Sequence, residues 1–150
     1  MIRLVRTDAK NQDFIKLVGK LDADLSKRDG EDHAFYNQFN SIAAIKYAVV
    51  AYENERVLGC GALKEYNSKA IEVKRMYVLI NERGKGVATK ILTNLEKWAA
   101  ELNYLYCILE TGKRQPEAIA LYQKKGYKIV PNYDPYIGIE NSLCFKKKIS

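Results

Sequence analysis

The spacing of hydrophobic residues along the chain changes several times between a helical period and a strand period. The first helical segment carries its hydrophobic residues at Phe14, Leu17, Val18, Leu21 and Leu25. This spacing predicts an amphipathic helix that ends near residues 25–28. Asn11 or Asp13 can cap its N-terminus, and Asp29-Gly30 interrupts the pattern at its end.

Two further segments follow the helical period clearly, and a third follows it weakly. One apolar face in residues 87–102 consists of Val87, Ile91, Leu92, Leu95, Trp98, Ala99 and Leu102. Pro116 suits the first turn of a helix over residues 117–124, and Gly126 suits its end. A weaker helical pattern covers residues 33–39.

Strands are predicted where short runs are rich in β-branched and aromatic residues. These runs are residues 2–5, 47–52, 57–63, 70–79, 104–109, 127–130 and 143–147. Turn residues at 53–56 and 67–68 indicate that the second, third and fourth runs are antiparallel neighbours. The whole order of elements predicts a mixed α/β domain with about seven strands.

Length and composition narrow the class of protein. The chain has 150 residues with no linker or repeat, which predicts one domain over residues 1–150. No apolar run approaches the roughly 18 residues of a membrane helix, and the N-terminus lacks a signal-like apolar stretch. We therefore expect a cytoplasmic protein without a membrane partner. Cys60, Cys107 and Cys144 are far apart, which favours buried thiols over a metal site or disulfides.

The formal charge of +7 favours an anionic ligand, such as a nucleotide cofactor or a nucleic acid. The positive residues are spread along the chain, however, and the densest run is 146–148 at the C-terminus. No nucleic-acid-binding motif accompanies them. A nucleic-acid-binding domain is therefore the weakest of the functional hypotheses, and we expect no nucleic-acid partner.

Residues 73–90 are the most informative segment about function. A strand-like run stops at Asn81, a short charged turn contains Gly84 and Gly86, and a helical pattern follows at once. Glycines allow the backbone to approach a ligand closely. The free N–H groups at a helix N-terminus and the helix dipole both favour an anion. The segment therefore predicts a binding site for a phosphate group of a cofactor.

This segment resembles the phosphate motif of the GNAT superfamily of N-acetyltransferases, in which Arg or Gln is followed by two residues, Gly, one residue, and Gly or Ala. The matching residues here are Arg83, Gly86 and Ala88. A second family feature is a late helix that ends in Tyr-x-x-x-Gly-aromatic, as at residues 122–127. The resemblance covers residues 2–149. It implies a largely antiparallel central sheet that is flanked by helices and splayed between strands four and five.

The resemblance also implies transfer of an acetyl group from acetyl-CoA to a primary amine by direct attack in a ternary complex. In the family, the motif loop holds the pyrophosphate and the pantetheine arm pairs with strand four. The implied cofactor-binding residues are Met76, Tyr77, Val78, Arg83, Gly84, Lys85, Gly86, Val87, Ala88, Gln115 and Tyr122. Many relatives have Asn where this chain has Gln115, which keeps an amide donor and acceptor on a longer side chain.

Two side chains are candidates for the proton transfers. Glu72, on the fourth predicted strand, is either the base that deprotonates the amine or an edge-strand glutamate that faces solvent or a lysine. Tyr122, by resemblance, gives a proton to the leaving CoA thiolate, and its alternative is packing against the sheet. A backbone N–H near Val78 would polarise the thioester carbonyl.

The acceptor is the least determined part of the hypothesis. By resemblance, the loop between the first two helices lines its pocket, and Glu31, Asp32, His33 and Tyr36 are the candidate substrate-binding residues. An acidic rim would suit a cationic amine, although a solvated acidic loop is the alternative. Residues 133–136 could form the other wall. A non-catalytic acyl-CoA-binding sensor or interaction module is the alternative function, and a homodimer is compatible with the family.

Overall fold

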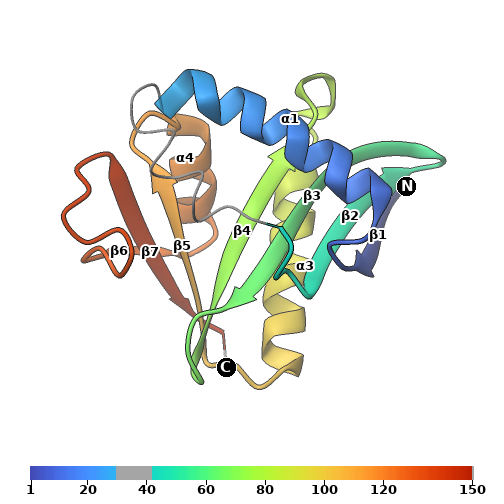
Figure 1. The fold of residues 1–150 in the computed structure, drawn as a ribbon. Helices are drawn as coiled ribbons and strands as arrows, with labels where there is room; N and C mark the ends of the chain where they lie inside the picture. The colour runs from blue at the N-terminus through green and yellow to red at the C-terminus, as the bar shows by residue number, and fades with distance from the viewer. Residues whose placement is uncertain (30–41, 150) are drawn as a thin grey trace.

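Seven strands form one mixed sheet in the order β1-β2-β3-β4-β5-β7-β6, shown in Figure 1. The computed structural model describes residues 1–29 and 42–149. The strands are β1 (Ile2–Thr7), β2 (Tyr47–Glu53), β3 (Arg56–Glu65), β4 (Ala70–Val78), β5 (Tyr106–Gly112), β6 (Lys128–Val130) and β7 (Ser142–Lys148). Every neighbouring pair is antiparallel except β4 and β5, which are parallel. The predicted α/β class and largely antiparallel sheet are confirmed.

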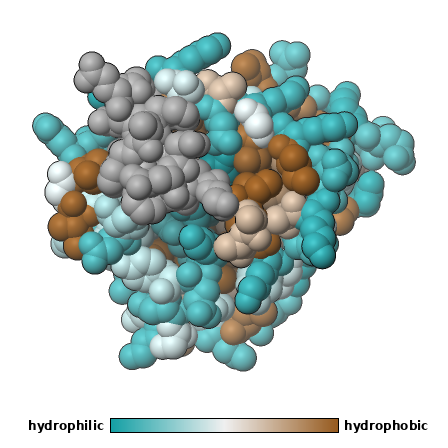
Figure 2. Space-filling model, viewed as in Figure 1, coloured by the Kyte–Doolittle hydropathy of each residue, from teal (hydrophilic) through white to brown (hydrophobic). Residues whose placement is uncertain are grey.

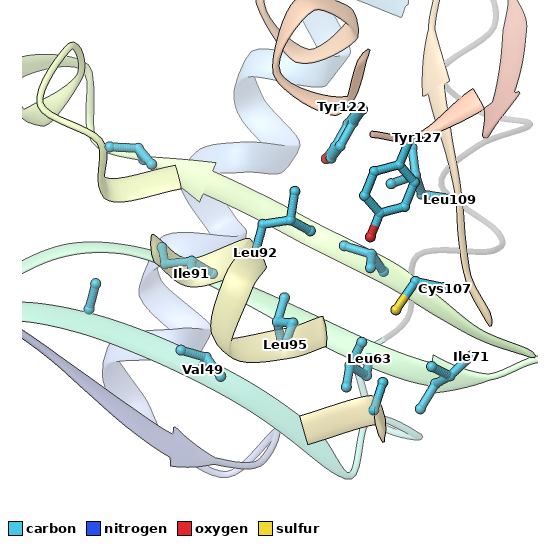
Figure 3. Packing of buried hydrophobic residues seen from close by; sticks show 14 of the residues in the cluster. Val49, Leu63, Ile71, Ile91, Leu92, Leu95, Cys107, Leu109, Tyr122 and Tyr127 are labelled. Carbon is cyan, nitrogen blue, oxygen red and sulfur yellow. The ribbon is translucent and has the colours of Figure 1, made fainter. Parts of the chain in front are cut away.

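Helices cover both faces of this sheet (Figure 1). They are α1 (Gln12–Asp29), α3 (Val87–Glu101), α4 (Pro116–Lys124) and the short 3-10 turn η2 (Ile80–Glu82). Successive residues of a strand point to opposite faces, so Val50 of β2 packs in a cluster with α1 while Val49 packs in a cluster with α3. Figure 3 shows Leu92 and Leu95 of α3 directed into the cluster that contains Val49.

The N-terminus of α1 resolves an alternative that the sequence left open. The Phe14 backbone N–H donates to Asn11 Oδ1 at 2.9 Å, so Asn11 is the capping residue. The Asp13 carboxylate instead accepts a hydrogen bond from the Tyr52 hydroxyl at 2.6 Å. Asp13 therefore joins α1 to β2.

The predicted strand over residues 104–109 is displaced along the chain. Asn103 has a φ of 71°, and the Tyr104 N–H bonds to the Ala99 carbonyl at 3.1 Å, which completes the turn after α3. Strand β5 consequently begins at Tyr106 and continues to Gly112, where it pairs with Ser142 of β7. This shift places Glu110 inside the sheet. The weak helix predicted over residues 33–39 lies outside the described residues.

Strands β4 and β5 separate after three residue pairs. Their register runs from Ala70 opposite Tyr106 to Glu72 opposite Ile108 and goes no further. A bulge follows in β4, where Arg75 has a φ of +58° and the pairing with β3 shifts. Figure 1 shows the two strands diverging toward α1 and α4. The predicted splay between strands four and five is confirmed.

The three cysteines are buried and free, which confirms that interpretation of the sequence. On the face shown in Figure 2, hydrophilic residues cover much of the surface and hydrophobic residues gather near its centre. Within residues 1–29 and 42–149, no helix combines the length and the apolar character needed to cross a bilayer.

Candidate active site

A cavity of about 370 Å³ opens where β4 and β5 diverge. Its walls come from α1, β4, the turn before α3, the first turn of α3, the end of β5, and α4. Ten predicted cofactor-binding residues line it, namely Met76, Tyr77, Val78, Arg83, Gly84, Gly86, Val87, Ala88, Gln115 and Tyr122. Segments that are far apart in the sequence therefore meet around a single opening in the sheet.

The turn before α3 has the geometry of an anion site. Gly84 and Gly86 adopt φ values of +85° and +82°, and a side chain is strained at both positions. Gly86 is the N-cap residue of α3, so no side chain occupies the first free N–H groups of the helix. The first turn of α3 also carries no acidic residue. An anion at this end would meet unoccupied backbone donors and a favourable helix dipole.

Lys85 is the predicted cofactor-binding residue that does not line the cavity. Its Nζ lies 2.6 Å from Glu82 Oε1 and 3.8 Å from Glu53 Oε1. Two carboxylates therefore hold the ammonium beside η2 and β2. Binding of the cofactor by Lys85 therefore stays a prediction.

The outer end of β4 presents backbone groups to the opening. The Leu79 N–H donates to the Leu58 carbonyl at 2.9 Å, and Val78 lies opposite Gly59. Hydrogen-bonded and non-bonded pairs alternate in an antiparallel ladder. The N–H of Val78 therefore points away from β3, toward the gap left by β5. The same alternation turns the N–H of Met76 toward that gap and the N–H of Tyr77 toward β3.

Arg83 stabilises the outer end of β4. Its Nε donates to the Val78 carbonyl at 2.8 Å, and its guanidinium carbon lies 5.4 Å from the centre of the Tyr77 ring. The hydrogen bond fixes the peptide group that follows Val78. Arg83 thus connects the anion site to the strand edge beside which the cavity opens.

Tyr122 enters the cavity from α4. Its ring packs against Tyr127 at 5.8 Å and Phe145 at 6.0 Å between centroids, and only 6% of the residue is exposed. Figure 3 shows the rings of Tyr122 and Tyr127 side by side. Burial, and secondarily the charge of Glu110, raise the pKa of the Tyr122 hydroxyl. The hydroxyl is therefore protonated at neutral pH.

Glu72 lies in the cavity wall, at the last position of β4 that pairs with β5, and is 7% exposed. The Tyr133 hydroxyl donates to Glu72 Oε2 at 2.7 Å, and Lys74 Nζ lies 3.8 Å from Glu72 Oε1. Burial and the Glu72 charge raise the pKa of the Tyr133 hydroxyl, so this donor stays protonated. The carboxylate therefore contacts a lysine, as one interpretation expected, and it also lines the cavity, while its role as the base stays a prediction.

Glu110 is a cavity residue that the sequence analysis did not single out. Cys107 and Leu109 of β5 pack in the α3 cluster, so the alternation of the strand turns Glu110 to the opposite face, as it does Glu72 on β4. The Ser142 hydroxyl donates to Glu110 Oε2 at 2.8 Å. The available signal is an acidic residue directly after an apolar predicted strand, because the predicted strand ends at Leu109 whereas β5 continues to Gly112.

The predicted acceptor residues have different outcomes. Glu31, Asp32, His33 and Tyr36 lie outside the described residues. In the segment before β7, Tyr136 lines the cavity, Tyr133 contacts Glu72, and Asp134 lines a smaller neighbouring cavity. The face of the sheet that carries Glu72 and Glu110 is therefore bordered by aromatic side chains.

Comparison with known proteins identifies the family. Residues 15–127 match the Acetyltransferase (GNAT) family. YjgM of Escherichia coli, an uncharacterised N-acetyltransferase, is 40% identical over 84 residues, or 55% of this chain and 50% of that protein. YsnE of Bacillus subtilis, also an uncharacterised N-acetyltransferase, is 32% identical over 101 residues, or 66% of this chain and 67% of that protein. The chain thus spans about half the length of the first relative and two thirds of the second.

The fold comparison agrees. The crystal structure of a candidate acyl-CoA N-acyltransferase from Klebsiella pneumoniae superposes with a TM-score of 0.84 at 26% sequence identity, covering 100% of this chain and 99% of that one. Most of the chain, including the turn before α3 and the helix that carries Tyr122, lies within the family match. The chain therefore belongs to the Acetyltransferase (GNAT) family.

Proposed function

We propose that this protein transfers an acetyl group from acetyl-CoA to a primary amine by direct attack in a ternary complex. The observation that carries the proposal is the cavity between β4 and β5, which joins an anion site at α3 to buried acidic and phenolic side chains. Within residues 1–29 and 42–149, all three cysteines are buried. None of these thiols is placed to form a covalent acetyl intermediate.

The residues suited to hold acetyl-CoA follow from this geometry. The backbone N–H groups around Gly84, Gly86 and Ala88 would hold the diphosphate. The outward-facing N–H of Val78 would donate to an amide carbonyl of the pantetheine arm, as a further strand pairs with a sheet edge. Bound acetyl-CoA would supply the acetyl group as a thioester, with a carbon open to attack and a sulphur that can leave.

Three groups of the chain have roles in the transfer. Glu72 accepts a proton from the ammonium group of the acceptor, because a free alkylamine with a pKa near ~10.4 is mostly protonated at neutral pH. The Met76 N–H, near Val78 and further from the anion site, donates a hydrogen bond to the carbonyl oxygen where negative charge develops. The Tyr122 hydroxyl donates a hydrogen bond to the departing sulphur. The amine forms the new C–N bond as the C–S bond breaks and the sulphur leaves with the bonding electron pair. The nitrogen then loses its second proton to solvent, and the thiolate takes a proton from solvent.

A panel of primary amines with detection of released CoA thiol tests this proposal. Acetyl-CoA should also raise the melting temperature, since a ligand at ~100 times its Kd stabilises the folded state by about 2.7 kcal/mol. Absence of any thermal shift at millimolar acetyl-CoA would contradict the proposal. A clear shift without turnover of any amine would instead favour the acyl-CoA-binding sensor.

A further inference from the structure

The bulge in β4 decides which backbone N–H groups face the cavity. Before the bulge, the Ala70 carbonyl accepts from the Tyr66 N–H, so the even-numbered residues bond across to β3. Beyond the bulge, the Leu79 N–H donates to the Leu58 carbonyl, so the odd-numbered residues bond to β3. One extra residue in β4 causes this exchange. Without the bulge, the N–H of Met76 would point at β3 and away from the opening.

The peptide group between Arg75 and Met76 lies inside the bulge. These two residues together lie opposite Gly61 of β3. The thiol of Cys60 donates to the Arg75 carbonyl at 3.4 Å. Burial raises the pKa of the Cys60 thiol to about 12, so this donor keeps its hydrogen at neutral pH. Because a trans peptide directs its C=O and its N–H to opposite sides, the Met76 N–H is directed away from β3.

Side chains on both faces of the sheet hold this peptide group. Arg75 is 5% exposed and extends toward α1, where its Nη2 donates to the Asp22 carboxylate and, at 3.5 Å, to the Val18 carbonyl. Figure 1 shows α1 crossing the sheet at this end. On the opposite face Met76 packs on the backbone of Gly61, where an added Cβ would come within 2.6 Å of the Met76 sulphur. The peptide group is therefore fixed from both faces.

The conformation of Arg75 requires support from its surroundings. A φ of +58° strains a residue that has a Cβ, and a buried guanidinium loses its hydration. The pairing of β3 with β4 places the bulge, and the ion pair with Asp22 keeps the Arg75 side chain turned toward α1. A buried cation that loses its partner is driven toward solvent. Loss of Asp22 would therefore turn the bulge and the peptide group within it.

We propose that Arg75 and Asp22 are positioning residues for the acetyl transfer, because their ion pair holds the bulge and thereby aims the Met76 N–H at the carbonyl oxygen of the thioester. The inference rests on the proposed function and adds two residues that act through Met76 rather than on the reacting atoms. The anion site at α3 and the N–H of Val78 do not involve this ion pair. Its loss should therefore lower kcat and leave CoA affinity unchanged.

Asp22→Ala tests the ion pair without changing a cavity side chain, because Asp22 does not line the cavity. We expect kcat with an amine that the protein acetylates to fall at least about tenfold, since outright loss of one such donor costs about 10²–10³ in kcat. CoA affinity should stay within about twofold, because the amides at α3 are intact.

Asp13→Ala is the matched control for this variant. It makes the same change in the same helix and also breaks a contact between α1 and the sheet, the hydrogen bond from Tyr52, away from the cavity. Its kcat should equal that of the unmodified protein. Equal kcat values in Asp22→Ala and Asp13→Ala would overturn the proposal.

Two substitutions of Arg75 separate its charge from its bulk. Arg75→Met and Arg75→Lys both keep a long unbranched side chain at this backbone position, but only lysine can pair with Asp22. Arg75→Met should lower kcat at least as much as Asp22→Ala does, and Arg75→Lys should lower it less. Equal losses in these two variants would contradict a role for the ion pair.

Amide hydrogen exchange reports on the Met76 N–H without an acceptor. In the unmodified protein, saturating acetyl-CoA should slow exchange at Met76 and Val78 by at least about tenfold. In Asp22→Ala it should do so at Val78 but slow Met76 by less than about threefold. Undiminished protection of Met76 in this variant would overturn the inference alone. Absence of both protection and turnover in the unmodified protein would instead contradict the proposed function on which the inference rests.

Discussion

The Tyr122 hydroxyl has to keep its proton at neutral pH and also to assist the departure of the CoA thiolate. Burial and the nearby charge of Glu110 raise the pKa of its hydroxyl, which keeps the proton available at neutral pH. The CoA thiol has a pKa near ~8.5, so complete proton transfer from this phenol to the thiolate is uphill. We therefore expect Tyr122 to stabilise the leaving sulphur through a hydrogen bond, with the proton following from solvent. The rate contribution should then be smaller than that of a matched general acid.

Replacing Tyr122 by Phe tests this role. We expect kcat to fall on the order of tenfold to a hundredfold, near the lower limit for acid catalysis, with little change in CoA affinity. Tyr127→Phe is the matched control, because Tyr127 packs on Tyr122 but does not line the cavity. Steady-state kinetics of both variants measure kcat, and CoA titration measures the affinity. Equal kcat values in the two variants would assign Tyr122 to packing alone.

Individual helices, strands and turns could be predicted from the sequence better than the contacts between them. The period of the apolar residues in α3 and the glycines before it predicted the turn and the helix N-terminus of the candidate anion site without any tertiary information. The pattern gave no sign of the bulge at Arg75, because a positive φ at an arginine is imposed by the pairing of β3 with β4. Glu110 was missed for a similar reason, since its partner Ser142 is brought to it by β7.

The conformation of the turn before α3 leads to a prediction about cofactor binding. Gly86→Ala places a side chain at a φ of +82°, which costs roughly 1–2 kcal/mol and disturbs the first amides of the helix. We expect at least a tenfold loss of CoA affinity, equivalent to about 1.4 kcal/mol. Isothermal titration with CoA measures it.

Gly138→Ala provides a matched control for this substitution. Gly138 has a φ of +80°, and an added Cβ there would meet open space, as at Gly86. Gly138 does not line the cavity. The Gly138→Ala variant should therefore lose as much stability as Gly86→Ala in a melting experiment, while its CoA affinity stays unchanged. A parallel loss of CoA affinity in both variants would mean that the effect of Gly86→Ala is general destabilisation.

The whole molecule consists of two parts of a sheet that share a short parallel contact. Strands β1 to β4 form one part and β5, β7 and β6 the other, with direct pairing only from Ala70 to Glu72. Ion pairs reinforce the connection, since Lys147 of β7 lies 2.9 Å from Glu96 of α3 and Arg28 of α1 contacts Glu117 of α4. A ligand in the splay would therefore add contacts between two parts that hydrogen bonds join weakly.

Amide hydrogen exchange can detect this bridging at neighbouring residues. The N–H groups of Met76 and Val78 face the gap, whereas the N–H of Tyr77 already faces β3. Saturating acetyl-CoA should slow exchange at Met76 and Val78 by at least about tenfold, because an amide gains protection when it acquires a hydrogen-bond partner. Tyr77 should change much less.

The alternation itself distinguishes the proposed arrangement from general tightening. A ligand that only rigidifies the protein would protect all three amides alike, since it lowers the opening of the whole strand. A ligand held at the anion site alone would protect the first turn of α3 and leave Met76 and Val78 unchanged. Only an arm lying along β4 protects every second residue, because successive amides of a strand point to opposite sides.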